Sequence, residues 1–238
     1  MVSAQALVFD VFGTLVDWYS PIKRIAERIG AERGVPIDGG RLARMWRRGY
    51  RPAMDTVRTG ARPWCNFDEL HRGTLADVLA EMDLELAEPD RDRLVAEWHR
   101  LEPWPDTVAG LAELGTHFIT GTMSNGHVRM LVDLARHGGM RFDVIFSAEL
   151  AGTYKPDPSV YLTAARLLEL PPQQVMLVAC HQTDLAGAAA AGLRTAYVSR
   201  PAEWGPEGAG PDGTGPPAPA AADVAAADLI DLARRLTT

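Results

Sequence analysis

Short runs of apolar residues alternate with segments of helical periodicity along much of this chain. Apolar runs bounded by turn residues and separated by helical patterns are typical of strands in a parallel sheet with helices on both faces. The sequence therefore predicts a doubly wound α/β core. The expected strands are Gln5–Asp10, His117–Met123, Asp143–Phe146, Val175–Ala179 and Thr195–Val198.

Between the first two expected strands the pattern is helical throughout, which predicts an inserted all-helical cap. We expect the core to comprise residues 1–18 and 103–238, and the cap residues 19–102, with a hinge at Pro103–Pro105. A Gly- and Pro-rich stretch, Trp204–Pro219, predicts an irregular loop before a last helix at Asp228–Leu236. The expected cap helices are Arg41–Val57, Phe67–Met82 and Pro89–Leu101.

Composition narrows the class of protein. The 238 residues carry a formal net charge of −7, which argues against nucleic acid as a general partner. The two cysteines, Cys65 and Cys180, have no metal-ligand spacing, and no apolar stretch predicts a signal peptide or a membrane span. We therefore expect a cytoplasmic globular protein. Only two of the 24 basic residues are lysines, Lys23 and Lys155.

Polar side chains follow the expected strands where the strands end. The carboxyl ends of parallel strands meet at one edge of a sheet, where a crevice forms. Asp10 lies at such an end and could act as a nucleophile, with a lysine such as Lys155 to keep it ionised. Thr14 and Ser124 offer hydroxyls that could orient the nucleophile and a substrate carboxylate.

Four segments together resemble the motifs of the haloacid dehalogenase superfamily, and most closely its L-2-haloacid (type II) branch. The resemblance covers essentially the whole chain and implies a Rossmann-like core with an inserted helical cap. It also implies a homodimer and a reaction that needs no cofactor or metal. The segments are Asp10–Asp17, Ser124–Gly126, Lys155–Pro158 and the segment around Asp184.

Two departures from the phosphatases of this superfamily favour carbon–halogen chemistry. Those phosphatases carry a second Asp two residues after the nucleophile, where this chain has Phe12. They also hold Mg²⁺ with acidic residues after the fourth strand, where Cys180 replaces the first and leaves Asp184. Halide leaves as a stable anion, so dehalogenation needs neither the general acid nor the metal.

The resemblance implies a two-step hydrolysis of short 2-haloalkanoic acids. Asp10 displaces halide from behind and forms an aspartyl ester, which water then hydrolyses to a 2-hydroxy acid of inverted configuration. In the family, the residue that corresponds to Asp184 activates this water beside the lysine. His181, three residues earlier, is a rival base.

The resemblance also assigns the substrate pocket. Arg47, in the Trp-Arg pair of the first long cap helix, and Asn125 are expected to hold the halide, with Arg48 and Arg51 as competing cations. Phe12, Tyr161 and His181 are expected to complete the substrate site. The family has an aromatic residue just before the motif-four Asp, where this chain has Thr183.

Three alternatives to the dehalogenase remain open from the sequence. The same attack could open the strained ring of azetidine-2-carboxylate, as related family members do. A Mg²⁺-dependent phosphatase of the same fold is less favoured because of Phe12 and Cys180. A catalytically idle binding protein is disfavoured by the joint presence of the motif residues.

Overall fold

A parallel sheet forms the centre of the protein. The computed structural model describes residues 4–206 and 222–238, so the part of the predicted loop from residue 207 onward lies outside the described residues. All strand pairs in the sheet are parallel, which confirms the predicted α/β class. The strand order is β4 (Ile119–Thr122), β1 (Ala6–Phe9), β5 (Val175–Ala179), β6 (Arg194–Val198) and β7 (Val224–Ala226).

The central position of β1 determines where Asp10 lies. All four residues of β1 are fully buried because strands flank it on both sides and helices cover both faces. The Asp10 backbone N–H still donates to the Val178 carbonyl at 3.0 Å, so the chain leaves the sheet only after this residue. The Asp10 side chain therefore emerges at the carboxyl edge of the sheet, between the ends of β4 and β5.

Within the central sheet, the sequence prediction was wrong about one strand and missed another. Asp143–Phe146 forms no regular strand; it makes only isolated bridges, such as Gly121 to Val144. The Asp143 carboxylate accepts the backbone N–H of Thr120 at 2.8 Å, so a side chain takes a place that a strand carbonyl would hold. The missed strand is β7, whose three residues are too few to show a periodicity.

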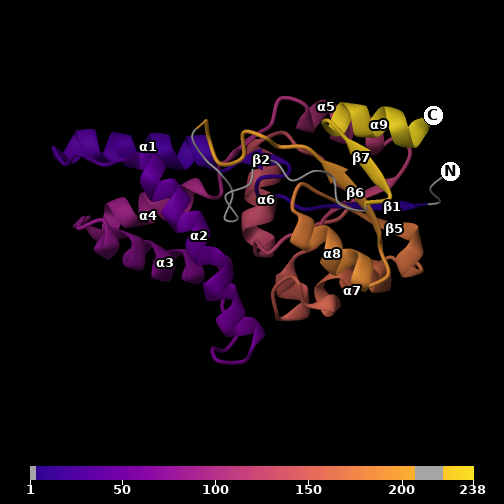
Figure 1. The fold of residues 1–238 in the computed structure, drawn as a ribbon, viewed down its shortest axis with the longest axis horizontal. Helices are drawn as coiled ribbons and strands as arrows, with labels where there is room; N and C mark the ends of the chain where they lie inside the picture. The colour runs from indigo at the N-terminus through magenta and orange to yellow at the C-terminus, as the bar shows by residue number, and fades with distance from the viewer. Residues whose placement is uncertain (1–3, 207–221) are drawn as a thin grey trace.

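Helices cover both faces of the sheet. Figure 1 shows α5 and α9 on one side and α7 and α8 on the other, with both chain ends at the far end of the sheet. The helices of the sheet-containing part are α5 (Thr107–Leu114), α6 (Val128–His137), α7 (Pro158–Leu167), α8 (Gln182–Ala190) and α9 (Leu229–Thr237). Within the described residues, no helix is both long and apolar enough to cross a membrane.

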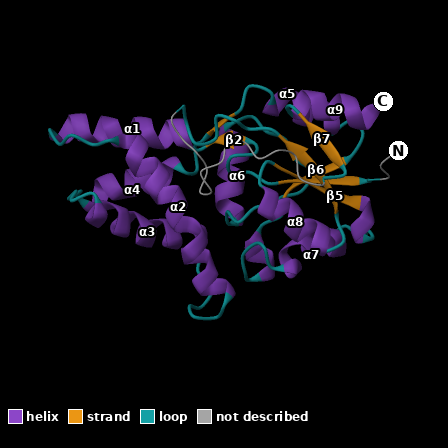
Figure 2. Ribbon diagram, in the orientation of Figure 1, coloured by secondary structure: helices purple, strands orange, loops and turns teal. Residues whose placement is uncertain are grey.

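Four further helices, which we call the helical unit, pack together beyond the carboxyl edge of the sheet (Figures 1 and 2). The chain enters and leaves this unit through a short antiparallel pair, β2 (Val16–Asp17) and β3 (Glu102–Pro103). The helices are α1 (Tyr19–Arg33), α2 (Gly39–Arg58), α3 (Phe67–Glu81) and α4 (Glu88–Glu97). The sequence analysis did not predict α1 as a separate helix. The ends of α2, α3 and α4 agree with the three expected cap helices to within a few residues.

An aromatic cluster joins the helical unit to the end of β1. Phe12 stacks on Phe67 with ring centroids 5.5 Å apart and meets the edge of Trp98 at 6.0 Å. Trp98 in turn packs against Trp46 and Tyr50. Such aromatic pairs contribute about 0.5–1.5 kcal/mol each beyond the area they bury. The residue that replaces the second Asp of the phosphatases therefore packs as an apolar contact between the two parts of the molecule.

Candidate active site

The Asp10 carboxylate accepts hydrogen bonds at both oxygens. Thr14 Oγ1 donates to Oδ2 at 2.7 Å, and Lys155 Nζ donates to Oδ1 at 3.2 Å. His181 Nδ1 lies 3.1 Å from Oδ2. Burial would raise the pKa of Asp10, but Lys155, His181 and Thr14 together hold it well below its usual range. The carboxylate is thus ionised and fixed in direction, as a nucleophile requires.

Lys155 joins Asp10 to a second carboxylate. Its Nζ lies 2.7 Å from Asp184 Oδ2, and Tyr161 donates its hydroxyl to Asp184 Oδ1 at 2.8 Å. Burial lowers the pKa of Lys155, but the two carboxylates outweigh it and raise the pKa overall. Burial, with repulsion from Asp10, raises the pKa of Asp184. The ammonium therefore stays charged, while Asp184 is the more basic of the two carboxylates.

The turn after β1 directs the Thr14 hydroxyl at the nucleophile. The backbone N–H of Cys180 donates to Thr14 Oγ1 at 3.0 Å, so the threonine proton remains available for Asp10. Gly13 has φ +87°, a left-handed conformation that favours glycine. This turn brings Thr14, four residues after Asp10, back against the carboxylate.

His181 lies between two carboxylates. Its Nδ1 faces Asp10 and its Nε2 faces Glu203 Oε1 at 2.9 Å. A neutral imidazole has one N–H and could donate to only one of them, whereas the imidazolium donates to both. Burial opposes the charge, yet the Glu203 and Asp10 carboxylates raise the pKa of His181 well above its usual value. The geometry therefore favours a doubly protonated ring.

Glu203 is a buried member of the site that the sequence analysis missed. Its side chain is 8% exposed, accepts the indole N–H of Trp18 at 3.1 Å, and lies 3.7 Å from Arg47 Nη2. A Cβ at position 13 would collide with the Glu203 carboxylate, which is a second reason for Gly13. The available signal was its position: Glu203 follows the end of β6 by five residues, as the other site residues follow their own strands.

Arg47 reaches this network from α2. Its guanidinium lies over the rings of Trp18 and Tyr50, at 5.7 and 5.1 Å from their centroids. Its buried Nε has no hydrogen-bond partner among the described residues. The competing Arg48 lies over the ring of Trp204 instead. Arg47 thus keeps a free donor beside the site, as an anion pocket requires.

The loop after β4 contributes backbone positioning. Asn125 Oδ1 accepts the backbone N–H of Lys155 at 2.9 Å, which leaves the Asn125 amide group as a donor. The buried Ser124 Oγ accepts the backbone N–H of Gly126 at 3.2 Å. Neither side chain bonds to Asp10.

The structure thus brings most of the predicted site residues into one hydrogen-bonded network. Arg47 and Asn125 lie at its border, and Ser124 and Phe12 make no side-chain hydrogen bond to it. His181 and Asp184, the two candidate bases, both lie close to the nucleophile. His181 contacts Asp10 directly, and Asp184 is connected to Asp10 through Lys155. The network residues are Asp10, Thr14, Lys155, Tyr161, His181 and Asp184.

One group at the site has ligand types that suit a metal ion: Cys180, His181 and Glu203. The surroundings do not fit a cation. Burial raises the pKa of the Cys180 thiol, and Arg47 and the His181 ring already face the Glu203 carboxylate. Protein cations therefore occupy the place that a metal ion would take.

Comparisons with known proteins agree with this geometry. A family model described as haloacid dehalogenase-like hydrolase matches residues 4–192. The chain is 30% identical over 201 residues to (S)-2-haloacid dehalogenase 4A of Burkholderia cepacia, with 83% of this chain and 84% of the relative covered. The crystal structure of the L-2-haloacid dehalogenase PA0810 is 45% identical with a TM-score of 0.91, covering 98% of this chain and 99% of that one. The defluorinating L-2-haloacid dehalogenase Rha0230 is 38% identical with a TM-score of 0.92, covering 99% and 96%. The chain therefore belongs to the haloacid dehalogenase-like hydrolases, in their haloacid dehalogenase branch.

Proposed function

We propose that the protein hydrolyses short 2-haloalkanoic acids to 2-hydroxy acids and halide, with Asp10 as the nucleophile and without a metal. The observation that carries the proposal is the Asp10 carboxylate, which is ionised and accepts hydrogen bonds at both oxygens. At the position where a phosphatase has its general acid, this chain has Phe12, which packs against Phe67. The names of the similar proteins, which are haloacid dehalogenases, support the same substrate class.

In the first step, Asp10 Oδ1 attacks the carbon that bears the halogen. An Asp10–carbon bond forms, the carbon–halogen bond breaks, and the halide leaves with the bonding pair on the opposite face. Oδ1 is the more available oxygen, because Oδ2 is bonded to Thr14 and His181. The free donors of Arg47 and Asn125 receive the halide. Helices α1–α4 act as a cap that excludes water from this step.

In the second step, water attacks Cγ of the Asp10 ester. Asp184 takes the proton from the water, because its raised pKa makes it a usable base and Lys155 holds it in place. His181 is not the base, since a ring that donates to both Asp10 and Glu203 has no free lone pair. The bond between Cγ and the ester oxygen breaks, and the departing alkoxide takes the proton from Asp184 to give the hydroxy acid. The second proton of the water is released to solvent, and Asp10 returns as a carboxylate.

His181 has a different task in this step. Once Oδ1 carries the ester bond, Oδ2 is the carbonyl oxygen, on which negative charge develops as water attacks. Thr14 Oγ1 and His181 Nδ1, at 2.7 and 3.1 Å from Oδ2, then act as an oxyanion hole. Glu203 keeps the ring protonated and in position. Attack from behind the halogen predicts inversion, so the L-2-haloacid gives the D-2-hydroxy acid.

The test is halide release from L- and D-2-chloropropionate, chloroacetate and fluoroacetate in buffer with excess EDTA. We expect release from the L isomer with formation of D-lactate, and a fall of at least about 10³-fold in D10N. Fluoroacetate is included because Rha0230 is a defluorinating enzyme. Unchanged turnover in D10N would contradict the assigned nucleophile.

Two further assays separate the remaining alternatives. Opening of azetidine-2-carboxylate without halide release would retain the nucleophile but change the substrate. Hydrolysis of a phosphate monoester only in the presence of Mg²⁺ would contradict the metal-free proposal. Homodimer formation and a cytoplasmic location stay predictions.

A further inference from the structure

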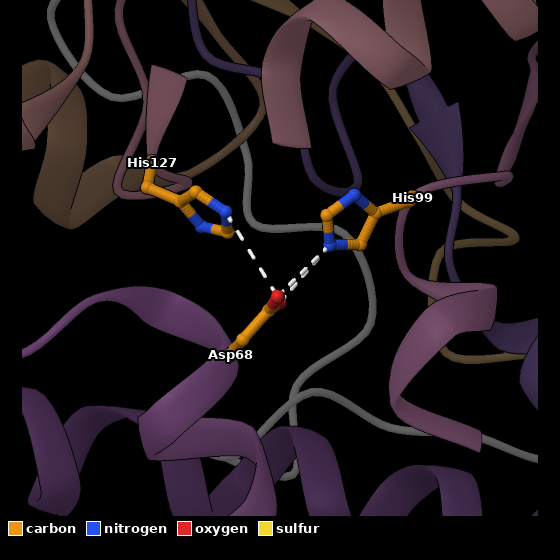
Figure 3. Close-up of side chains that lie close together, drawn as sticks. All are labelled: Asp68, His99 and His127. Carbon is orange, nitrogen blue, oxygen red and sulfur yellow. Dashed lines mark hydrogen bonds and ion pairs between the residues drawn. The ribbon is translucent and has the colours of Figure 1, made fainter. Parts of the chain in front are cut away.

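A second cluster of polar side chains lies where the helical unit meets the sheet. Asp68 is in the first turn of α3, His99 follows α4, and His127 comes directly before α6. Figure 3 shows the two rings pointing at the Asp68 carboxylate from opposite sides. The three residues come from three segments that are distant in the chain, and none belongs to the hydrogen-bonded network around Asp10.

Hydrogen bonding explains two of the three side chains. His99 Nε2 lies 3.1 Å from Asp68 Oδ1, and His99 Nδ1 lies 3.0 Å from Asp133 Oδ2 on α6. Arg129 holds Asp133 at 2.9 Å. The His99 ring is therefore fixed in orientation, with one nitrogen toward an outer carboxylate and the other toward Asp68.

Hydrogen bonding does not explain His127. Its side chain is 9% exposed and its Nδ1 has no partner among the described residues. Its Nε2 points at Asp68 Oδ2 from 3.9 Å, which is too long for a hydrogen bond. Neither nitrogen of this largely buried ring therefore has a hydrogen bond among the described residues, and Nε2 faces a carboxylate oxygen at a separation that two ligands of one ion can have.

We propose that Asp68, His99 and His127 bind a zinc-class divalent ion that fastens the helical unit to the sheet domain. The three ligand atoms lie within 4.8 Å of one another. Zinc bonds of about 2.0–2.2 Å place tetrahedral ligands roughly 3.3–3.5 Å apart. The two separations from Asp68, 3.1 and 3.9 Å, lie on either side of that value, and the two histidine nitrogens lie within 4.8 Å of each other, so a shift of under about 1 Å in each side chain suffices.

The ligand chemistry selects the metal class. Two imidazole nitrogens and one carboxylate suit Zn²⁺, Co²⁺ or Ni²⁺ and are unsuited to Mg²⁺ or Ca²⁺, which prefer oxygen ligands. Zinc replaces the proton on His99 Nε2, which is released to solvent, while Nδ1–H stays bonded to Asp133. Water supplies the fourth ligand. The outer chain of Asp133 and Arg129 is the second shell that metal-bound histidines commonly have.

The site is separate from the proposed reaction but touches its geometry. His127 is two residues after Asn125, and Asp68 is next to Phe67, which stacks on Phe12. A bound ion would therefore hold the loop of Ser124 and Asn125 against the helical unit. No reaction step passes through it, so halide release in EDTA and zinc binding test different claims.

The test uses the full chain, stripped with EDTA, dialysed and titrated with ZnCl2 by calorimetry. We expect one zinc per chain and a higher Tm with zinc present. H127Q keeps the bonds of His99 to Asp68 and Asp133 but should weaken binding by at least tenfold and abolish the rise in Tm. H117Q, at an exposed histidine that pairs with Glu113, is the matched control and should bind zinc as the parent does.

Co²⁺ identifies which ligands are used. Binding at the proposed site gives a visible d–d spectrum without a thiolate-to-cobalt band, because no cysteine takes part. A thiolate band that C180A removes would assign the metal to Cys180 instead and overturn the proposal. Equal zinc affinity in the parent chain and H127Q, or no zinc bound at millimolar concentration, would overturn it as well.

Discussion

The active site and the junction between the helical unit and the sheet both place a histidine between two carboxylates, but their surroundings differ. At the active site, His181 lies between Asp10 and Glu203. Lys155 faces Asp10 and Arg47 faces Glu203; the carboxylates and Lys155 are buried, and His181 and Arg47 are partly buried. Protein cations therefore already balance the negative charge, and what the site still offers is free donors for an anion.

At the junction, the neighbour of the corresponding histidine is another imidazole. His99 lies between Asp68 and Asp133, and His127 faces Asp68 without a hydrogen bond. Arg129 pairs with the outer carboxylate, Asp133. Among the described residues, the side chains within ion-pair distance of the inner carboxylate are the two histidine rings, and the nearby Arg72 pairs with Asp92 instead. The same three-residue pattern thus suits an anionic substrate at one place and a metal cation at the other.

The largest expected effect is on stability, and it comes from removing the buried lysine of the active site. K155M leaves Asp10 and Asp184 buried without their shared cation, which should lower the free energy of unfolding by about 3–5 kcal/mol. K23M removes the only other lysine, whose pairing with Glu27 is exposed, and should leave that energy nearly unchanged. Urea unfolding of both variants measures the difference. Equal losses would show that Lys155 does not compensate buried charge.

A smaller effect distinguishes the tasks of the two histidines. H181A removes one donor of the proposed oxyanion hole and should lower kcat about 10²–10³-fold, with accumulation of the aspartyl ester in single-turnover experiments. H99A should instead remove zinc binding. H117A serves as the control for kcat because it is distant from both clusters and exposed. Ester that fails to accumulate in H181A would contradict the role of His181 in the second step.

The smallest effect is a shift in pH dependence. The pKa of His181 is raised, so the imidazolium is present at low pH and lost as the pH rises through this raised value. E203Q removes one of the carboxylates that raise it, so the alkaline limb of kcat should move to lower pH, while E113Q should leave it in place. If His181 were instead the base, it would act as the neutral ring, and E203Q would move the acid limb of kcat to lower pH while the alkaline limb stayed in place; that result would contradict the imidazolium.

Much of the active site could be predicted from the sequence. Asp10 follows a strand directly and Asp184 comes five residues after another, while the resemblance to the dehalogenases placed Lys155 beside them; in the structure Lys155 contacts both carboxylates. The strand at Asp143–Phe146 was wrongly predicted because an apolar run reports burial and not which partner supplies the hydrogen bonds. The three-residue β7 was too short to detect.

Glu203 was missed because its position after β6 is a weak signal by itself, and the junction cluster has no local pattern in the sequence. Glu203 lies in an irregular turn after β6, and its partners His181, Trp18 and Arg47 come from three other segments. The junction residues are likewise ordinary surface-type residues of helix ends when they are considered one by one. Only their distances reveal that they converge.

The amino-acid sequence by itself determined the fold class and singled out Asp10 as the proposed nucleophile. Both depend on local features: apolar periodicity, which reports burial, and residue types at strand ends, which report chemistry. The tertiary structure decided which groups face the two nitrogens of His181 and where His127 lies. These depend on the distances between groups from remote segments, and electrostatic and hydrogen-bond energies change steeply with distance.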